Sequence, residues 1–256
     1  MILLPSAKNA LAFQRDVKTD SPAEVPFLGT MKHIPKLTPF EIGLLSLSLV
    51  TVILSSLLSN AGILNALASA VGVIALIFVA KGLPIGQLFT VFFSILYALV
   101  AWKFRYWGEM ITYLGMSMPI ALFSFLSWIR HPYEKGTGEV KIATLTKGKT
   151  IALLFLTVGV TVLFYVPLNY FETPNLAVST LSVTTSFLAA SLLYLRSPLY
   201  ALSYAANDVV LIVLWTMAAI EDFTFLPMIA CFVAFFANDL YGFFNWMRMK
   251  NKQKSP

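Results

Sequence analysis

The chain has 256 residues, of which 58% are hydrophobic and 12% are charged, and its mean hydropathy is +0.79. Soluble domains carry about 25% charged residues, so this composition excludes an ordinary soluble domain and indicates a protein that crosses the membrane several times. The net charge of +6 does not indicate nucleic-acid binding, because the Lys and Arg residues lie in loops and tails. There they set membrane topology and face anionic lipid. Cys231 is the single cysteine and excludes an internal disulfide.

Residues 1–38 are polar and predict a cytoplasmic tail, with a short interfacial helix near Asn9–Val17. Eight apolar stretches follow, each close to the ~20 residues that a spanning helix needs. The break at Ser59-Asn60 is the weakest, so 39–80 also permits another division. Pro119 is expected to kink the fourth stretch. The predicted spans are 39–58, 61–80, 83–102, 109–130, 150–170, 175–195, 199–219 and 223–247.

Positive charge is divided unequally between the two sides of this arrangement. Sixteen of the 18 Lys and Arg residues fall on the side that holds both termini, and only Lys103 and Arg105 fall on the other. Short loops rich in Lys and Arg stay in the cytoplasm. We therefore predict that both termini are cytoplasmic.

Two parts of the chain resemble one another. One opens at 81–84 (KGLP) and ends in Trp128-Ile-Arg, and the other opens at 196–198 (RSP) and ends in Trp246-Met-Arg. A single linking helix between them leaves both in the same orientation, which is a known plan of membrane transporters. The predicted fold is all-α and integral to the membrane, with two parallel three-helix repeats joined 3+1+3 and an extra N-terminal span. Its parts are the tail 1–38, the extra helix 39–58, the first repeat 61–130, the loop 131–149, the linking helix 150–170, the second repeat 175–247 and the basic tail 248–256.

Polar side chains gather in the second half of the sequence. Two Asn-Asp pairs, at 207–208 and 238–239, lie inside apolar stretches. A carboxylate is expensive in hydrocarbon, so we interpret the pairs as the wall of a polar cavity inside the helix bundle. Aromatic residues share the helical faces of these pairs. The predicted substrate site consists of Gln87, Thr184, Tyr204, Asn207, Asp208, Trp215, Asn238, Asp239, Tyr241, Asn245 and Trp246.

This mixture of side chains favours a neutral or cationic nucleoside over a nucleotide. Carboxamides and carboxylates pair with ribose hydroxyls, and aromatic faces attract a cationic ring. A phosphate would need Arg or Lys, which the membrane interior lacks. The chain carries no Walker loop, no GxSxG and no cluster of His, Cys and Asp, so we expect neither an enzyme nor a cofactor nor a metal site. Two alternatives stay open: a cation-coupled transporter of another small vitamin, nucleoside or sugar, and a structural or receptor-like membrane protein.

Three stretches resemble the PnuC family of bacterial nicotinamide riboside transporters. They read YWGEMITYLGMSMPIALFSFLSWIRHPYEKG, STLSVTTSFLAASLLYLRSPLYALSYAANDVVLIVLW and IEDFTFLPMIACFVAFFANDLYGFFNWMRM. The resemblance runs from about Gly62 to Arg248. It implies an architecture similar to that of SWEET sugar transporters, a homotrimer and a place in the bacterial inner membrane. It also implies facilitated diffusion of nicotinamide riboside, by alternating access around a site between the repeats, and trapping of the substrate by a cytoplasmic kinase. Its binding residues map onto Asn207, Asp208, Asn238, Asp239, Tyr241 and Trp246.

Overall fold

A computed structural model describes residues 36–60, 62–134 and 138–254, and the interfacial helix expected near residues 9–17 lies outside them. Eight helices in this part of the chain are long and apolar enough to cross a membrane, so the predicted eight-span, all-α fold is confirmed. The helices are α3 (Pro39–Leu58), α4 (Ile63–Ala80), α5 (Ile85–Lys103), α6 (Trp107–Thr112) with η1 (Tyr113–Ser117) and α7 (Met118–Arg130), α8 (Lys147–Tyr170), α9 (Leu176–Tyr194), α10 (Leu199–Glu221), and η2 (Phe223–Phe225) with α11 (Leu226–Lys252).

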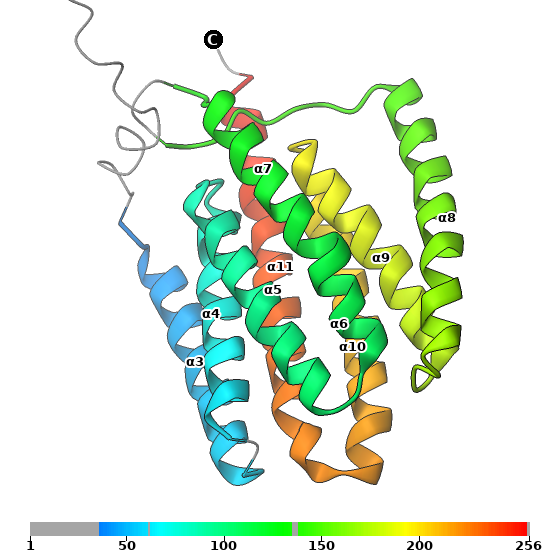
Figure 1. Ribbon diagram of the computed structural model, residues 1–256. Coiled ribbons are helices and arrows are strands. Elements are labelled where there is room, and N and C mark those ends of the chain that lie inside the picture. The colour runs from blue at the N-terminus through cyan, green and yellow to red at the C-terminus, as the bar shows by residue number, and fades with distance from the viewer. Residues whose placement is uncertain (1–35, 61, 135–137, 255–256) are drawn as a thin grey trace, which may run out of the picture.

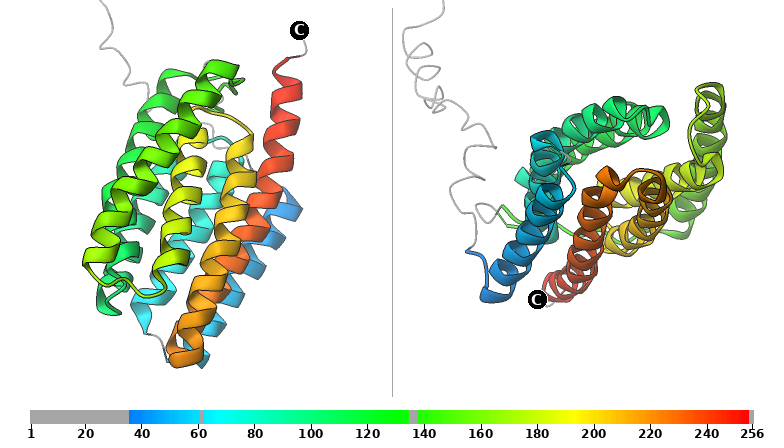
Figure 2. Two further views of the ribbon diagram at one scale, coloured as in Figure 1. Left: turned by 90° about the vertical axis from the view of Figure 1, so that its right-hand side faces the viewer. Right: turned by 90° about the horizontal axis from the view of Figure 1, so that it is seen from below.

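The helices form one bundle with α3 and α8 at opposite edges (Figures 1 and 2). Helix α11 packs against α3, α4 and α10, while α9 packs against α8 and α10. Helix α5 contacts α4 and the three segments of the fourth span. We call the end of the bundle that carries Lys36, Lys81, Arg196 and the end of α11 the basic face, and the other end the opposite face.

The turns after α4 and α9 have the same backbone structure. Each contains one residue in the left-handed conformation, Gly82 with φ 68° and Arg196 with φ 57°. In both turns the N–H of this residue and the N–H after it bond back to the last turn of the helix, which is the Schellman pattern of helix termination. The two turns therefore join the helices before and after them with equivalent backbone geometry.

Two tryptophans at the basic face connect the two halves reciprocally. Trp128 Nε1 donates to the carbonyl of Leu193 at 3.4 Å, and Trp246 Nε1 donates to the carbonyl of Val79 at 3.0 Å. The two acceptors hold equivalent places, each three residues before the left-handed residue of its turn. The two indole rings also pack together, with centroids 5.4 Å apart. We interpret this exchange as the contact of two parallel three-helix repeats.

The connection from α7 to α8, predicted as a plain loop, runs across the basic face and is fastened to it. Val140 is fully buried and its N–H donates to the Gly82 carbonyl at 3.0 Å. Ala143 N–H donates to the Arg196 carbonyl at 3.0 Å, so one segment holds both equivalent turns. The Gln253 side chain, beyond α11, accepts from Ile142 N–H at 2.8 Å.

The fourth span is interrupted where Pro119 was expected to kink it. A π-helical segment, Tyr113–Ser117, separates α6 from α7, and Pro119 lies in the first turn of α7. Proline has no N–H for the usual helical bond to the preceding turn, and the wider π turn accommodates that loss. Tyr113 and Ser117 of this π segment face the interior of the bundle.

Helix α3 is attached to the bundle by polar contacts that hydrocarbon makes strong. Glu41 is 1% exposed and pairs with Lys81 Nζ at 2.9 Å. Tyr241 Oη donates to Glu41 Oε1 at 2.7 Å, and Asn238 Nδ2 donates to Ser48 Oγ at 3.1 Å. The polar side of α11 that faces α3 is therefore used to hold the extra helix.

Replacing Lys81 with Met should lower the thermal stability of the purified protein. The change leaves the Glu41 carboxylate buried without its cation, which costs on the order of 3 kcal/mol of unfolding free energy. Thermal unfolding in detergent measures the effect. The double variant with Glu41→Gln should recover part of the loss, because no charge is then left unpaired. An unchanged melting temperature for Lys81→Met alone would show that the ion pair contributes nothing to the attachment of α3.

Candidate functional site

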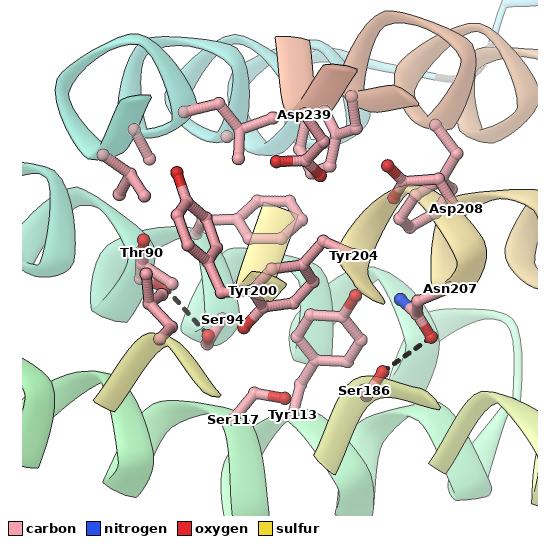
Figure 3. Close-up of a pocket in the computed structure, with 18 residues that line it drawn as sticks. Thr90, Ser94, Tyr113, Ser117, Ser186, Tyr200, Tyr204, Asn207, Asp208 and Asp239 are labelled. Atoms are coloured by element: carbon pink, nitrogen blue, oxygen red, sulfur yellow. Dashed lines mark hydrogen bonds between the residues drawn. The ribbon is translucent and has the colours of Figure 1, made fainter. Parts of the chain in front are cut away.

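An enclosed pocket lies inside the bundle, between its middle and the basic face (Figure 3). Helices α4, α5, α9, α10 and α11 and the π segment η1 all contribute to its wall. Its free volume is about 60 Å³, which is room for roughly two water molecules. The polar side chains that line it are Thr90, Ser94, Tyr113, Ser117, Ser186, Tyr200, Tyr204, Asn207, Asp208 and Asp239.

Two carboxyl groups occupy one side of the pocket. Asp208 on α10 is 2% exposed and Asp239 on α11 is 3% exposed, and the two side chains interact directly. Figure 3 shows them turned toward one another above Tyr204. Oxygen Oδ2 of Asp208 has no hydrogen-bond partner within the described part of the chain. A group of this kind is expensive in a membrane interior and marks a functional site.

Asn207 is oriented by two hydroxyl groups of α9. Thr185 Oγ1 and Ser186 Oγ donate to Asn207 Oδ1 at 2.8 and 2.9 Å. With its oxygen held in this way, the side chain presents its amide N–H₂ group to the pocket (Figure 3). A fixed pair of N–H donors suits a hydroxyl or carbonyl oxygen of a ligand.

Six aromatic rings contribute to the remaining wall. Phe93 of α5 packs edge-on against Tyr113 and Phe235, with centroids 5.8 and 5.2 Å apart. Gly72 of α4 permits this packing, because a Cβ there would overlap the Phe235 ring. Flat ring faces next to carboxyl groups form an environment that attracts a planar cation.

Packed aromatic side chains lie beyond the pocket lining toward each face of the bundle. Toward the basic face, Trp246 lies 4.6 Å from Tyr200 and 5.4 Å from Trp128 between ring centroids. Toward the opposite face, Trp215 Nε1 donates to Tyr97 Oη at 3.0 Å. A solute therefore needs a movement of these groups to enter or leave.

Four of the predicted site residues line the pocket: Tyr204, Asn207, Asp208 and Asp239. The pattern that found them was the placement of polar residues on one face of an apolar helix. That pattern does not show which of two polar faces on α11 points inward. In the structure Asp239 faces the pocket, while its neighbour Asn238 faces α3.

Six of the seven other predicted residues bond elsewhere, because neighbouring helices offer them partners. Asn238, Tyr241 and Asn245 bond to Ser48, Glu41 and the Ala80 carbonyl. Trp215 and Trp246 donate to Tyr97 and to the Val79 carbonyl, and Thr184 bonds to Thr161 at the contact with α8. Gln87 is fully buried on α5 outside the pocket wall, and neither end of its amide has a partner in the described residues.

Several pocket residues were not predicted. Thr90, Ser94 and Tyr200 line the wall although they stand in stretches that read as ordinary apolar helix. Tyr113 and Ser117 reach it through the π segment, which no periodic pattern indicates. Glu109, outside the pocket lining, is also buried, at 1% exposed, and accepts from Ser182 Oγ of α9 at 3.0 Å.

An enclosed polar pocket within eight membrane-length helices defines a membrane transporter of small solutes. A family model described as nicotinamide mononucleotide transporter matches residues 62–248, and the chain belongs to this family. The family consists of membrane transporters and not enzymes.

Relatives and a solved structure agree with this assignment. The nicotinamide riboside transporter PnuC of Neisseria mucosa is 26% identical over 190 residues, which are 73% of this chain and 72% of that protein. PnuC of Haemophilus influenzae, also called a nicotinamide riboside transporter, is 26% identical over 213 residues, which are 82% and 91%. The crystal structure of the vitamin B3 transporter PnuC superposes with a TM-score of 0.76 at 23% identity, covering 89% of this chain and 98% of that one.

Replacing Asn207 with Leu should weaken the binding of a ligand in the pocket about five- to 150-fold. The change removes the N–H₂ donor from the pocket and leaves polar groups unpaired in a dry site, at ~1–3 kcal/mol. Calorimetric titration of the purified variants measures it. Asn238→Leu is the matched control: it should keep wild-type affinity and lose thermal stability, because Asn238 bonds to Ser48 of α3. The reverse result would place the site on the α3 side of α11.

Proposed function

We propose that this protein is a facilitative transporter of nicotinamide riboside. The observation that carries the proposal is the composition of the pocket wall, which combines two carboxyl groups, one carboxamide, hydroxyls and aromatic faces with no Lys, Arg or His. Nicotinamide riboside has a cationic pyridine ring, a carboxamide and a ribose, and each has a complementary group in this wall. The names of the two relatives support the same substrate.

The description of the family names the mononucleotide, which differs from the riboside by a phosphate. Phosphate recognition uses Arg, Lys or a helix N-terminus, and the pocket wall contains none of these cations. A phosphate beside Asp208 and Asp239 would instead meet like charge in a low dielectric. We therefore assign the riboside to this pocket and exclude the mononucleotide from it.

Transport requires the pocket to widen and its two closures to open in turn. Ligand pockets for molecules of this size measure about 300–1,000 Å³, well above the 60 Å³ of free volume here. The aromatic closures around Trp246 and Trp215 lie on either side of the pocket, where alternating access places its two gates. The chain moves between states in which one closure at a time is open.

Uptake by such a carrier continues while the riboside is removed on the inner side. Phosphorylation by a cytoplasmic kinase serves this purpose, because the phosphate makes the product unacceptable to the pocket. The family resemblance also supports a homotrimer in the bacterial inner membrane. Helix α8, which packs on the bundle mainly through α9, has a long exposed apolar face for lipid or for a second copy.

Both termini are assigned to the cytoplasm in this proposal, because the basic face carries most of the Lys and Arg residues. Reporter fusions placed after the last residue and within the turn at Glu172 should report opposite sides of the membrane. The C-terminal fusion should be the cytoplasmic one. Two fusions on the same side would contradict the eight-span topology, and an external C-terminus would contradict the orientation.

Proteoliposomes without any ion gradient should equilibrate labelled nicotinamide riboside and exclude nicotinamide mononucleotide. The expected reason is that the pocket accepts a cation and a ribose but has no partner for a phosphate. Protein-free vesicles control for leak. Equal transport of the two compounds would refute the assigned substrate. Accumulation of the riboside above equilibrium, driven by an imposed proton or sodium gradient, would favour a cation-coupled transporter instead.

A further inference from the structure

The carboxyl groups of Asp208 and Asp239 form a pair with no cation beside it. They line the same pocket and are turned toward one another (Figure 3), and each residue is at most 3% exposed. The pocket that they line contains no Lys, Arg or His. Asp208 lines that pocket, and its Oδ2 is fully buried with no partner among the described residues. This free oxygen points to a ligand, since a buried polar atom is otherwise satisfied in a folded protein.

The other titratable groups around the pair are all weak acids that are neutral at physiological pH. They come from α10, α11 and the π segment, and α4, α5 and α9 present only apolar or hydroxyl side chains to the pocket. None can supply a positive charge to balance two carboxylates. These neighbours are Tyr200 and Tyr204 on α10, Cys231 on α11 and Tyr113 on η1.

Two adjacent carboxylates cannot both be ionised in such a place. Like charges in contact repel strongly in a low dielectric, and one proton held between the two groups removes that repulsion. The shared proton also makes one carboxyl a hydrogen-bond donor to the other, which satisfies part of the hydrogen-bonding capacity of the pair. The pair then carries one negative charge and not two.

We propose that Asp208 and Asp239 share one proton and act together as a monovalent counter-ion, so that the pocket selects nucleosides with a single positive charge. This inference rests on the proposed function and adds the charge of the substrate to it. A monocation at the free oxygen of Asp208 makes the loaded pocket neutral, which is the charge state that crosses hydrocarbon at least cost. A neutral nucleoside of the same shape leaves the negative charge unbalanced.

The shared proton leads to an unusual expectation for amide substitutions. An Asn in place of either Asp donates an N–H bond to the remaining carboxylate, as the protonated carboxyl does, and the pair keeps its single charge. Asp208→Asn and Asp239→Asn should therefore each retain the preference for a cation. The double variant has no charge and should lose that preference. Two independent carboxylates would behave differently, because each single substitution would then remove one of two charges.

The test compares nicotinamide riboside with its reduced dihydropyridine form, which keeps the ribose and the carboxamide but is neutral. Titration calorimetry on the full-length protein in detergent gives both affinities, and their ratio is the readout. Wild type and both single variants should prefer the cation by on the order of 100-fold. The double variant should bring the ratio close to one. Ser94→Ala, an uncharged substitution in the same wall, should lower the affinity for both ligands equally and leave the ratio unchanged.

The outcomes separate this inference from the proposed function. Equal wild-type affinities for the two compounds would overturn the counter-ion and leave the riboside as substrate. No binding of the riboside to wild type would overturn both. A ratio that falls to one in either single variant would overturn the shared proton. The ratio of the two affinities in wild type tests the counter-ion even where a variant fails to fold. Each single variant tests the shared proton independently of the other single variant.

Discussion

A pair of carboxyl groups inside a membrane constrains everything around it. Hydrocarbon cannot solvate Asp208 and Asp239, so the helices that carry them must pack with these residues turned away from lipid. The surrounding wall supplies hydroxyls, a carboxamide and ring faces from five segments. No cationic side chain lines the pocket, so the wall carries a single negative charge once the two carboxyl groups share a proton. The substrate that the pocket takes is determined by that charge.

The reciprocal tryptophans explain how two halves of the chain enclose a site that neither forms alone. Trp128 and Trp246 each donate to the other half, and their rings close the pocket toward the basic face. The connection from α7 to α8 fastens both equivalent turns at the same end. A change at this end therefore acts on both halves together, which suits a closure that must open as a unit.

The extra helix α3 decides the role of the second Asn-Asp pair. Its Ser48 and Glu41 accept hydrogen bonds from Asn238 and Tyr241. These bonds turn one polar side of α11 outward from the pocket and leave Asp239 on the inner side. Two Asn-Asp pairs that look alike in the sequence therefore have different roles. Asn207 and Asp208 both line the pocket, whereas Asp239 lines the pocket and Asn238 contacts α3.

The sequence by itself determined the number of spans, because apolar runs of membrane length and charged breaks are local properties. It also predicted a polar site, since carboxyl groups are expensive in apolar helices, and predicted that this site offers no cation to a phosphate. Only the tertiary structure decided which polar face of each helix points inward. That choice depends on the partners that other helices offer, as Ser48 does for Asn238 and Tyr97 for Trp215. The π segment before Pro119 and the position of Thr90 and Ser94 in the pocket wall likewise depend on packing between helices far apart in the chain. The periodicity along one helix does not contain that information.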